Sequence, residues 1–255
     1  MPEEGIPRTA VVTGASSGLG VAIAEALAAL GWRVAVGARR VDRLADTAKR
    51  IEAAGGVAFH QALDVTKPNS VEAFFSAAED ALGLVDVVVN NAGLSIPGHA
   101  WEITPEEIGH EIDVNLLGPM LVARRALPSM IGAKRGDLVF VTSDAARHPR
   151  PKQATYTATK AGLEGYARAL ALELEGTGVR STIVRPGPAA SEYAANWNPE
   201  TTAELIGYWP KFGLQRHLAF MPAEAVARAV VMAVTTPAGV YFDTLEVQPE
   251  APIQD

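Results

Sequence analysis

Short apolar runs alternate with longer amphipathic segments along most of the chain. The apolar runs are typical of β-strands and lie at residues 9–12, 33–36, 57–63, 85–89, 137–142, 179–185 and 241–247. Apolar residues at helical spacing fill the intervals, at 22–30, 41–54, 68–82, about 104–130, 154–175 and 223–234. The run at 85–89 is rich in valine, which is typical of a parallel strand buried on both faces. The alternation predicts an α/β fold, with one doubly wound parallel sheet of about seven strands and helices on both faces.

The stretch at about 189–220 breaks this alternation, because its apolar periodicity is weak. It is nevertheless rich in aromatic residues, which are Tyr193, Trp197, Tyr208, Trp209, Phe212 and Phe220. A long insertion within a compact domain is more often a lid or a binding loop than a mere connection. We therefore expect a substrate lid at about 189–220 within a single domain that spans residues 1–255. The alternative is that these rings pack only on one another or on a neighbouring subunit.

Composition and charge exclude several kinds of site. The 255 residues include no cysteine, so disulfides, thiolate nucleophiles and Cys-ligated metal centres are ruled out. The histidines lie in different predicted elements without an H-E-x-x-H pattern, and we expect no catalytic metal. A net charge of −7 gives no overall attraction to nucleic acid or to an anionic membrane. With neither a signal-peptide pattern nor a long apolar run, we expect a cytoplasmic protein that relies on oxygen and nitrogen side chains or on a bound cofactor.

A glycine-rich turn follows the first predicted strand and opens the next helix. Its sequence is Thr13-Gly14-Ala15-Ser16-Ser17-Gly18-Leu19-Gly20, with the spacing G-x-x-x-G-x-G. Glycines allow a tight turn and a close approach to a pyrophosphate, and the first amides of the helix supply hydrogen-bond donors. No Gly-Lys-Ser/Thr follows, which argues against a nucleoside triphosphate loop. We expect the residues of this turn to bind a dinucleotide cofactor, in particular Gly14, Ser16, Ser17, Gly18, Leu19 and Gly20.

The end of the second predicted strand favours NADP(H) over NAD(H). An acidic residue usually stands there and accepts the ribose 2′-hydroxyl of NAD(H). In this chain the position is Ala38, and Arg39 and Arg40 follow it. Arginine pairs with a 2′-phosphate through charge-assisted hydrogen bonds. The alternative is that both arginines only solvate the helix that follows.

A tyrosine and a lysine stand four residues apart near the start of the helix predicted at 154–175. At this spacing the side chains of Tyr156 and Lys160 share one helix face. A nearby ammonium favours the phenolate, so we expect Lys160 to lower the pKa of Tyr156 towards the working range of a general acid or base. The pair alone is weak evidence, because Tyr-x-x-x-Lys occurs by chance in many helices.

Several further short motifs stand in a characteristic order around this pair. Asn90-Asn91-Ala92-Gly93 follows the fourth predicted strand, Asn115 lies in the long helix, Ser143 ends the fifth strand, and Pro186-Gly187 follows the sixth. Together with the glycine turn, this set resembles the short-chain dehydrogenase/reductase family over essentially the whole chain. The resemblance implies a Rossmann-type fold and a catalytic tetrad of Asn115, Ser143, Tyr156 and Lys160. In that family the tyrosine is the acid/base, the serine binds the substrate oxygen, the lysine binds the nicotinamide ribose, and the asparagine supports a proton relay.

The resemblance also assigns further residues to the cofactor. Asp64 resembles the aspartate that contacts adenine, although it equally well caps the turn before Pro68. Val65, Asn90, Ala92, Pro186, Gly187, Tyr156 and Lys160 are expected to contact the cofactor as well. Ser191 stands where many members have threonine, and its hydroxyl is expected to reach the carboxamide. Asn90 and Asn91 have a structural alternative, which is to stabilise the end of the central strand, and Asn115 can instead bend its helix by bonding backbone.

The expected function is that of an NADP(H)-dependent carbonyl reductase or alcohol dehydrogenase. Ser143 and Tyr156 are expected to contact the substrate, and the abundance of rings favours a fairly apolar or aromatic compound. Residues after Ser143, including Arg147 and His148, are expected to wall the substrate pocket, where these two could contact a substrate carboxylate or phosphate; the alternative, favoured for His148, is an exposed loop residue. The alternatives are a non-catalytic NADP(H) sensor or scaffold, and an epimerase or dehydratase. The resemblance implies a homo-oligomer, a tetramer or a dimer, that pairs the helices around 116–130 and 154–175.

Overall fold

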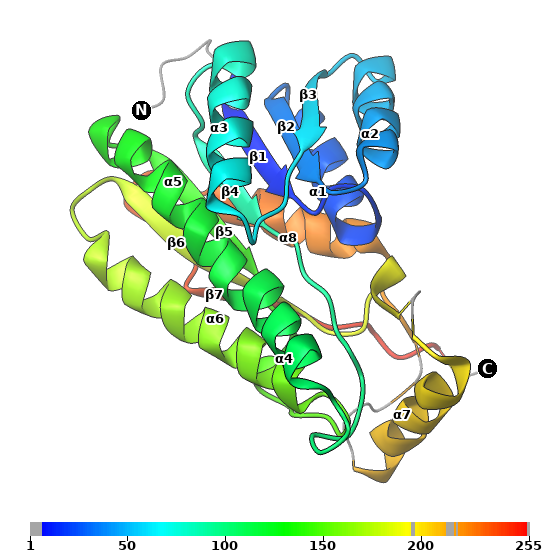
Figure 1. The fold of residues 1–255 in the computed structure, drawn as a ribbon. Helices are drawn as coiled ribbons and strands as arrows, with labels where there is room; N and C mark the ends of the chain where they lie inside the picture. The colour runs from blue at the N-terminus through cyan, green and yellow to red at the C-terminus, as the bar shows by residue number, and fades with distance from the viewer. Residues whose placement is uncertain (1–6, 195–196, 213–216, 218, 254–255) are drawn as a thin grey trace.

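A seven-stranded parallel sheet runs through the centre of the protein and confirms the predicted α/β fold (Figure 1). The computed structural model describes residues 7–194, 197–212, 217 and 219–253. The spatial order of the strands is β3-β2-β1-β4-β5-β6-β7. Their bounds are β1 (Thr9–Thr13), β2 (Arg33–Ala38), β3 (Val57–Ala62), β4 (Val87–Asn90), β5 (Gly136–Val141), β6 (Val179–Pro186) and β7 (Thr244–Val247).

Helices cover both faces of the sheet (Figure 1). The α-helices are α1 (Gly18–Ala28), α2 (Val41–Ala53), α3 (Pro68–Leu82), α4 (Pro105–Ile112), α5 (Gly118–Gly132), α6 (Ala154–Glu173), α7 (Pro199–Lys211) and α8 (Ala223–Thr235). Three short segments join them, the π-helical η1 (Asp113–Leu117) and the 3₁₀ turns η2 (Asp144–Ala146) and η3 (Glu192–Ala194).

The two faces of the sheet bury separate apolar cores. One core joins the sheet to α1, α2 and α8, through residues such as Ile23, Leu44 and Val230. The other joins it to α3, α5 and α6, where Phe74 and Phe140 are fully buried. Because β1, β4 and β5 are buried on both faces, their sequences are continuous apolar runs rather than alternating ones.

The direction of winding reverses between β1 and β4, which pair directly through Ala10–Val87 and Val12–Val89. Chain connections leave β1 towards β2 on one side and leave β4 towards β5 on the other. The loops at the carboxyl ends of these two strands therefore diverge and leave a crevice. Every side chain expected in the site follows the carboxyl end of a strand or lies on a helix beside this crevice.

The long helix expected at about 104–130 is present, but a π-helical turn interrupts it. Thr104 caps its start, and its hydroxyl accepts a hydrogen bond from the amide of Glu107. In η1 the amide of Gly118 donates to the carbonyl of Asp113, five residues back. Pro119 explains the interruption, because it has no N–H and its ring would clash with the carbonyl of residue 115 in a regular α-helix. The wide turn thus falls at Asn115.

The aromatic insertion contains a helix that its weak periodicity did not predict. Helix α7 begins after Asn198, whose side chain accepts a hydrogen bond from the amide of Glu200, with Pro199 in the first turn. It stands apart from the two helix layers (Figure 1). An isolated parallel bridge between Ala189 and Met221 brings together the two ends of the insertion. The side chain of Trp209, one of the expected rings, lies outside the described residues.

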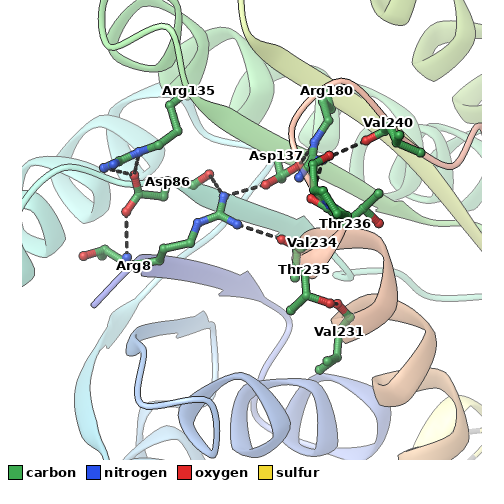
Figure 2. Close-up of polar contacts among 12 residues, drawn as sticks. Arg8, Asp86, Arg135, Asp137, Arg180, Val231, Val234, Thr235, Thr236 and Val240 are labelled. Carbon is green, nitrogen blue, oxygen red and sulfur yellow. Dashed lines mark hydrogen bonds and ion pairs between the residues drawn. The ribbon is translucent and has the colours of Figure 1, made fainter. Parts of the chain in front are cut away.

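A network of arginine and aspartate side chains ties the amino ends of the strands together (Figure 2). One carboxylate oxygen of Asp137 in β5 pairs with Arg8 and the other pairs with Arg180 of β6, at 2.5 and 2.6 Å. Arg8 also donates to the carbonyl of Val234 in α8 at 2.7 Å. Asp86 accepts from the amide of Thr9 and pairs with Arg135. These contacts lie at the edge of the sheet opposite the crevice and connect β1, β5, β6 and α8.

Replacement of Asp137 by asparagine should destabilise the protein without affecting its site. Asp137 is 4% exposed, and the change leaves Arg8 and Arg180 without their shared anion. We expect a loss of about 2–4 kcal/mol of unfolding free energy, measured by urea denaturation. The exposed Asp80→Asn on α3 is the matched control and should change the free energy by less than about 0.5 kcal/mol. A loss as small as that of the control would show that the network contributes little.

Candidate active site

A cleft of about 770 Å³ opens at the carboxyl ends of the strands. The glycine turn after β1 lines one end, and the loop after β4 and the start of α6 line the other. The segment after β6, including η3 and Trp197, covers it from outside. Of the expected site residues, all but Asn90 and Asn115 line this cleft.

The glycine turn is packed so closely that side chains would not fit. Gly14 has a φ of +69°, and a Cβ there would lie 2.8 Å from the Cα of Ala92. Gly18 has a φ of +53° and opens α1, with Ser191 beside it. The hydroxyl of Thr13 accepts hydrogen bonds from the amides of Asn91 and Ala92, both at 3.1 Å. The turn therefore has a fixed shape, with the amino end of α1 directed into the cleft, as an anion site requires.

Arg40 reaches across the glycine turn. Its guanidinium donates to the hydroxyls of Ser16 and Ser17, at 3.1 and 2.7 Å. It also pairs with Glu192 of η3 at 3.1 Å, and Arg43 of α2 pairs with the same carboxylate at 2.7 Å. Hydrogen bonds from Arg40 and Arg43 lower the pKa of Glu192. Arg39 is exposed at the rim of the cleft. The two arginines expected near a phosphate thus both border the cleft, and Arg40 already binds a carboxylate there.

Tyr156 and Lys160 are buried side by side on α6, as their spacing predicts. They are 6% and 4% exposed. The Lys160 Nζ lies 5.8 Å from the centroid of the Tyr156 ring and donates to the carbonyl of Val141 at 3.0 Å. Ser143 begins η2, and its Oγ accepts from the amide of Ala145 at 3.2 Å. The end of β5 and the first two turns of α6 therefore bring the serine, the tyrosine and the lysine to one wall.

The expected lowering of the Tyr156 pKa is wrong for this structure. Burial raises the pKa of the Tyr156 phenol, and hydrogen bonds with the Ser143 and Tyr193 hydroxyls offset only part of that rise. Burial lowers the pKa of Lys160 to about 8, against the opposing effect of Glu111. Removing the phenolate from water costs more than its neighbours return. At neutral pH, Tyr156 is a protonated phenol that can donate a proton.

Asn115 connects η1 to the loop after β4. Its Oδ1 accepts from the amide of Leu94 at 2.9 Å, and its Nδ2 donates to the carbonyl of Leu94 at 2.8 Å and to Thr159 at 3.2 Å. A Cβ on Gly93 would lie 3.2 Å from the Asn115 Oδ1 and 3.4 Å from the Lys160 Nζ. Asn115 thus bonds backbone in a neighbouring loop, and lies close to Lys160 behind the wall of the cleft.

Of the other residues expected to contact the cofactor, Asp64 and Val65 line the cleft and Asn90 does not. Asp64 lines the cleft with Val65, but its carboxylate also accepts from the amide and hydroxyl of Thr66, as expected of a turn cap. Although burial raises the pKa of Asp64, these bonds and the Arg39 and Lys67 cations lower it overall. Asn90 is 2% exposed and lies outside the cleft lining, and neither of its amide atoms bonds to a described residue.

The segment after β6 approaches the cleft through backbone and side chains. Pro186, Gly187 and Ser191 line the cleft, and the Gly187 amide donates to the carbonyl of Val247 in β7 at 2.8 Å. The Ser191 Oγ accepts from the amide of Tyr193 at 3.3 Å. Arg185, just before this segment, bonds Glu164 of α6 and Glu246 of β7. These ion pairs fix the start of the segment relative to α6.

Two aromatic residues of the insertion cover the tyrosine. The ring of Tyr193 lies 5.3 Å from that of Tyr156 and 5.0 Å from that of Trp197. The Trp197 indole N–H donates to the carbonyl of Ser95 at 2.9 Å. Tyr193 accepts a hydrogen bond from the Gln153 side chain at 2.7 Å. Part of the predicted insertion therefore closes the outer wall of the cleft over the catalytic candidates.

The sequence reasoning missed two polar residues in this wall, Arg150 and Gln153. Arg150 bonds both carboxylate oxygens of Asp144 at 2.7 Å, and both side chains are about nine-tenths buried. Gln153 is 1% exposed. By contrast, the expectation that Arg147 and His148 wall the pocket is wrong, because both are exposed and do not line the cleft. A charged residue just before a catalytic helix carries no pattern that distinguishes it from a solvated one, so sequence alone could not separate Arg150 from Arg147.

Comparisons with known proteins match the part of the chain that contains these site residues. A sequence model of the family described as short chain dehydrogenase matches residues 8–202. A short chain dehydrogenase of Pseudocercospora fijiensis is 40% identical over 193 residues, which are 74% of this chain and 62% of that protein. The chain thus spans less than two thirds of the length of that relative.

No helix in the described ranges is long and apolar enough to cross a membrane.

Two solved structures have a similar fold over nearly the whole chain. An alcohol dehydrogenase of the archaeon Thermococcus sibiricus, in complex with 5-hydroxy-NADP, is 32% identical with a TM-score of 0.81 and covers 96% of this chain and 99% of that one. A variant of actinorhodin polyketide ketoreductase with NADPH is 30% identical with a TM-score of 0.83, over 95% of this chain and 96% of that one.

Replacement of Asn115 by alanine should weaken the loop after β4. The change removes three hydrogen bonds and leaves the amide and carbonyl of Leu94 without their partner. We expect a loss of about 2–4 kcal/mol of unfolding free energy, because unsatisfied buried groups cost more than the bonds contribute. Asn69→Ala at the exposed start of α3 is the control. Equal effects of the two changes would contradict a structural role for Asn115.

Proposed function

The chain belongs to the short chain dehydrogenase family, a family of oxidoreductases, and we propose that it transfers a hydride between NADP(H) and a carbonyl or alcohol substrate. The observation that carries this proposal is the buried Tyr156–Lys160 pair, which faces the same cleft as Ser143 and the glycine turn. The alternative of a non-catalytic NADP(H) sensor has less support, because a sensor needs the turn but not the polar wall.

The described residues fit a dinucleotide along the length of the cleft. The glycine turn and the amino end of α1 suit the pyrophosphate, since both present backbone amides to an anion. Asp64 and Val65 border the adenine end, with Arg39 and Arg40 beside them. Lys160, Ala92, Pro186, Gly187 and Ser191 border the end that suits the nicotinamide and its ribose. Asn90 is not proposed as a cofactor contact, because its side chain is outside the lining. Asn91 has the structural role at the end of β4, since its side chain donates to the carbonyls of Thr13 and Gly14 at 2.9 and 3.3 Å.

A preference for NADP(H) follows from the charges at the adenine end. Ala38 offers no carboxylate to a ribose 2′-hydroxyl, whereas Arg39, Arg40 and Arg43 are grouped at the rim. A 2′-phosphate gains charge-assisted hydrogen bonds in such a group. The archaeal alcohol dehydrogenase and the ketoreductase of similar fold, which hold an NADP derivative and NADPH, give the same indication.

The polar wall can activate a carbonyl group. The hydride chemistry is supplied by the nicotinamide when the cofactor is bound. The hydroxyls of Ser143 and Tyr156 can both donate to the substrate oxygen, which stabilises the negative charge that develops there by about 3 kcal/mol for each good donor. Tyr156 then gives its proton to that oxygen; because burial raises the pKa of its phenol, Tyr156 still carries that proton at neutral pH. Lys160 supplies the positive charge that stabilises the resulting phenolate.

The walls of the substrate end favour a fairly apolar compound. Leu94, Tyr193, Trp197, Ile206 and Phe220 line this part of the cleft. The buried Asp144–Arg150 pair is neutral as a whole, so it does not favour an anionic substrate over a neutral one. We therefore propose an apolar or aromatic ketone or aldehyde, or the corresponding alcohol, as the substrate class.

A homo-oligomer is proposed on the outer face formed by α4, η1, α5 and α6. Large apolar side chains are exposed there, with Leu117 40%, Ile131 41% and Leu172 71% exposed. Gly165 on α6 has open space beside its Cα, which permits a close approach of a second helix. Whether two or four chains assemble is measured directly by light scattering.

Replacement of Tyr156 by phenylalanine should abolish turnover but not cofactor binding. The change removes the proton donor and keeps the ring in its packed position against Tyr193. We expect kcat for NADPH-dependent reduction of a panel of aromatic ketones to fall by at least about 100-fold. The Kd of NADPH, measured by fluorescence, should stay within about twofold. Tyr241→Phe at an exposed position is the control. A variant that keeps more than a tenth of the activity would contradict the assignment.

Replacement of Arg39 by aspartate should reverse the cofactor preference. The new carboxylate repels a 2′-phosphate and can accept a 2′-hydroxyl. We expect KM for NADPH to rise by about 10- to 100-fold, with little change for NADH. Arg50→Ala on the outer face of α2 is the matched control. Equal KM values for NADPH and NADH in the unmodified protein would overturn the NADP(H) preference itself.

A further inference from the structure

Glu111 is a fully buried carboxylic acid behind the catalytic wall. It lies in the last turn of α4 and is 0% exposed. Its Oε1 accepts from the amide of Ile96 at 3.2 Å, and its Oε2 has no hydrogen-bond partner among the described residues. A buried carboxylate oxygen without a partner costs free energy, so its presence needs an explanation.

Glu111 and Asn115 stand one helical turn apart and bind the same loop. Asn115 bonds both backbone groups of Leu94, and Glu111 bonds the amide of Ile96, two residues further along. Ser95 lies between Leu94 and Ile96, and its carbonyl accepts a hydrogen bond from the indole N–H of Trp197. A neutral amide at residue 111 would serve this purpose equally well, so the loop alone does not explain why the group is ionisable.

The charged group that acts electrostatically on Glu111 is the Lys160 ammonium of the neighbouring helix α6. Helix α4 packs against α6, and the Lys160 Nζ is held at the Val141 carbonyl, close to Asn115. From the other elements packed against it, the loop after β4 presents the backbone amide of Ile96, and η1 presents the neutral Asn115. Burial raises the pKa of Glu111 to about 7, although the hydrogen bond from Ile96 and the cation of Lys160 oppose the rise. Reciprocally, Glu111 opposes the fall in the pKa of Lys160.

We propose that Glu111 is a titrating positioning residue that controls the charge of Lys160, and through it the acid function of Tyr156. The proposal rests on the proposed function for its catalytic consequence, but the coupling of the two side chains does not depend on any activity. When Glu111 is neutral, Lys160 has no counter-charge from α4. When Glu111 is ionised, its carboxylate favours the ammonium and keeps Lys160 protonated to higher pH. The activity that is lost as Lys160 deprotonates is therefore lost only at a higher pH.

The pH profile of Glu111→Gln tests the catalytic consequence. The glutamine keeps an acceptor for the Ile96 amide and removes only the charge. We expect the ratio of kcat/KM between variant and unmodified protein to be near one at about pH 6, where Glu111 is mostly neutral, and to fall about 3- to 10-fold at about pH 9, because the pKa of Lys160 drops by about half to one unit. The exposed Glu106→Gln on the same helix is the matched control. A ratio that stays constant with pH overturns the proposal, because a purely structural defect acts at every pH.

Thermal unfolding of the cofactor-free protein tests the coupling without any activity. A carboxyl group whose folded pKa is raised contributes stability at low pH and loses it as pH rises through about 7. The Tm of Glu111→Gln minus that of the unmodified protein should therefore increase by about 3–8 °C between about pH 5 and pH 8. In a Lys160→Met background the increase should be larger and its midpoint should lie at a higher pH, because the cation that favours the folded-state carboxylate is gone.

The two measurements separate the possible failures. A Tm difference that does not change with pH, or a midpoint unaffected by Lys160→Met, overturns the proposal whatever the activity is. A protein that reduces no carbonyl compound contradicts the proposed function, while the unfolding experiment still decides whether Glu111 and Lys160 are coupled. Glu111→Leu, which also removes the bond to Ile96, should lower activity at every pH and so distinguishes the loop contact from the charge.

Discussion

The burial of the Lys160 ammonium is the constraint on which the site depends. A buried cation is costly unless polar groups surround it, and Lys160 meets this need with the carbonyl of Val141 at the end of β5. This requires α6 to pack closely on β5 and the loop after β4 to approach without a side chain, which Gly93 permits. It also places Asn115 and Glu111 on the neighbouring helix within the same electrostatic environment. The polar wall of the cleft is thus one connected arrangement rather than a set of independent residues.

Much of the fold was predictable because burial on both sheet faces leaves a strong pattern. The seven strands and most helices lie near the expected positions, although β7 begins at Thr244 rather than at 241. The π-helical turn was not predicted, because its cause, Pro119, is also common in the first turn of an ordinary helix. Helix α7 was not predicted; it lies outside the two helix layers, and Leu205 is the only buried residue among its described side chains.

The site was predictable in its residues but less so in their electrostatics. The spacing of Tyr156 and Lys160 places them on one face of α6, as expected. The predicted lowering of the Tyr156 pKa was wrong. The sequence spacing indicates that a cation is near the phenol, but it does not show that burial removes the water around the phenol. Glu111 was missed for the same reason. It stands in a polar, acidic stretch, Glu106-Glu107-Ile108-Gly109-His110-Glu111, in which nothing distinguishes a buried carboxyl group from an exposed one.

In the segment after β6, two adjacent residues contact different ends of the cleft. Glu192 is held by Arg40 and Arg43 beside the glycine turn, while the ring of Tyr193 rests against Tyr156. Consecutive Cα atoms are about 3.8 Å apart, so neither residue can move far without the other. An anion bound by the two arginines would compete with Glu192, whose neighbour in the chain covers the phenol. The two ends of the cleft therefore share one short segment of chain instead of being bounded by separate parts of the fold.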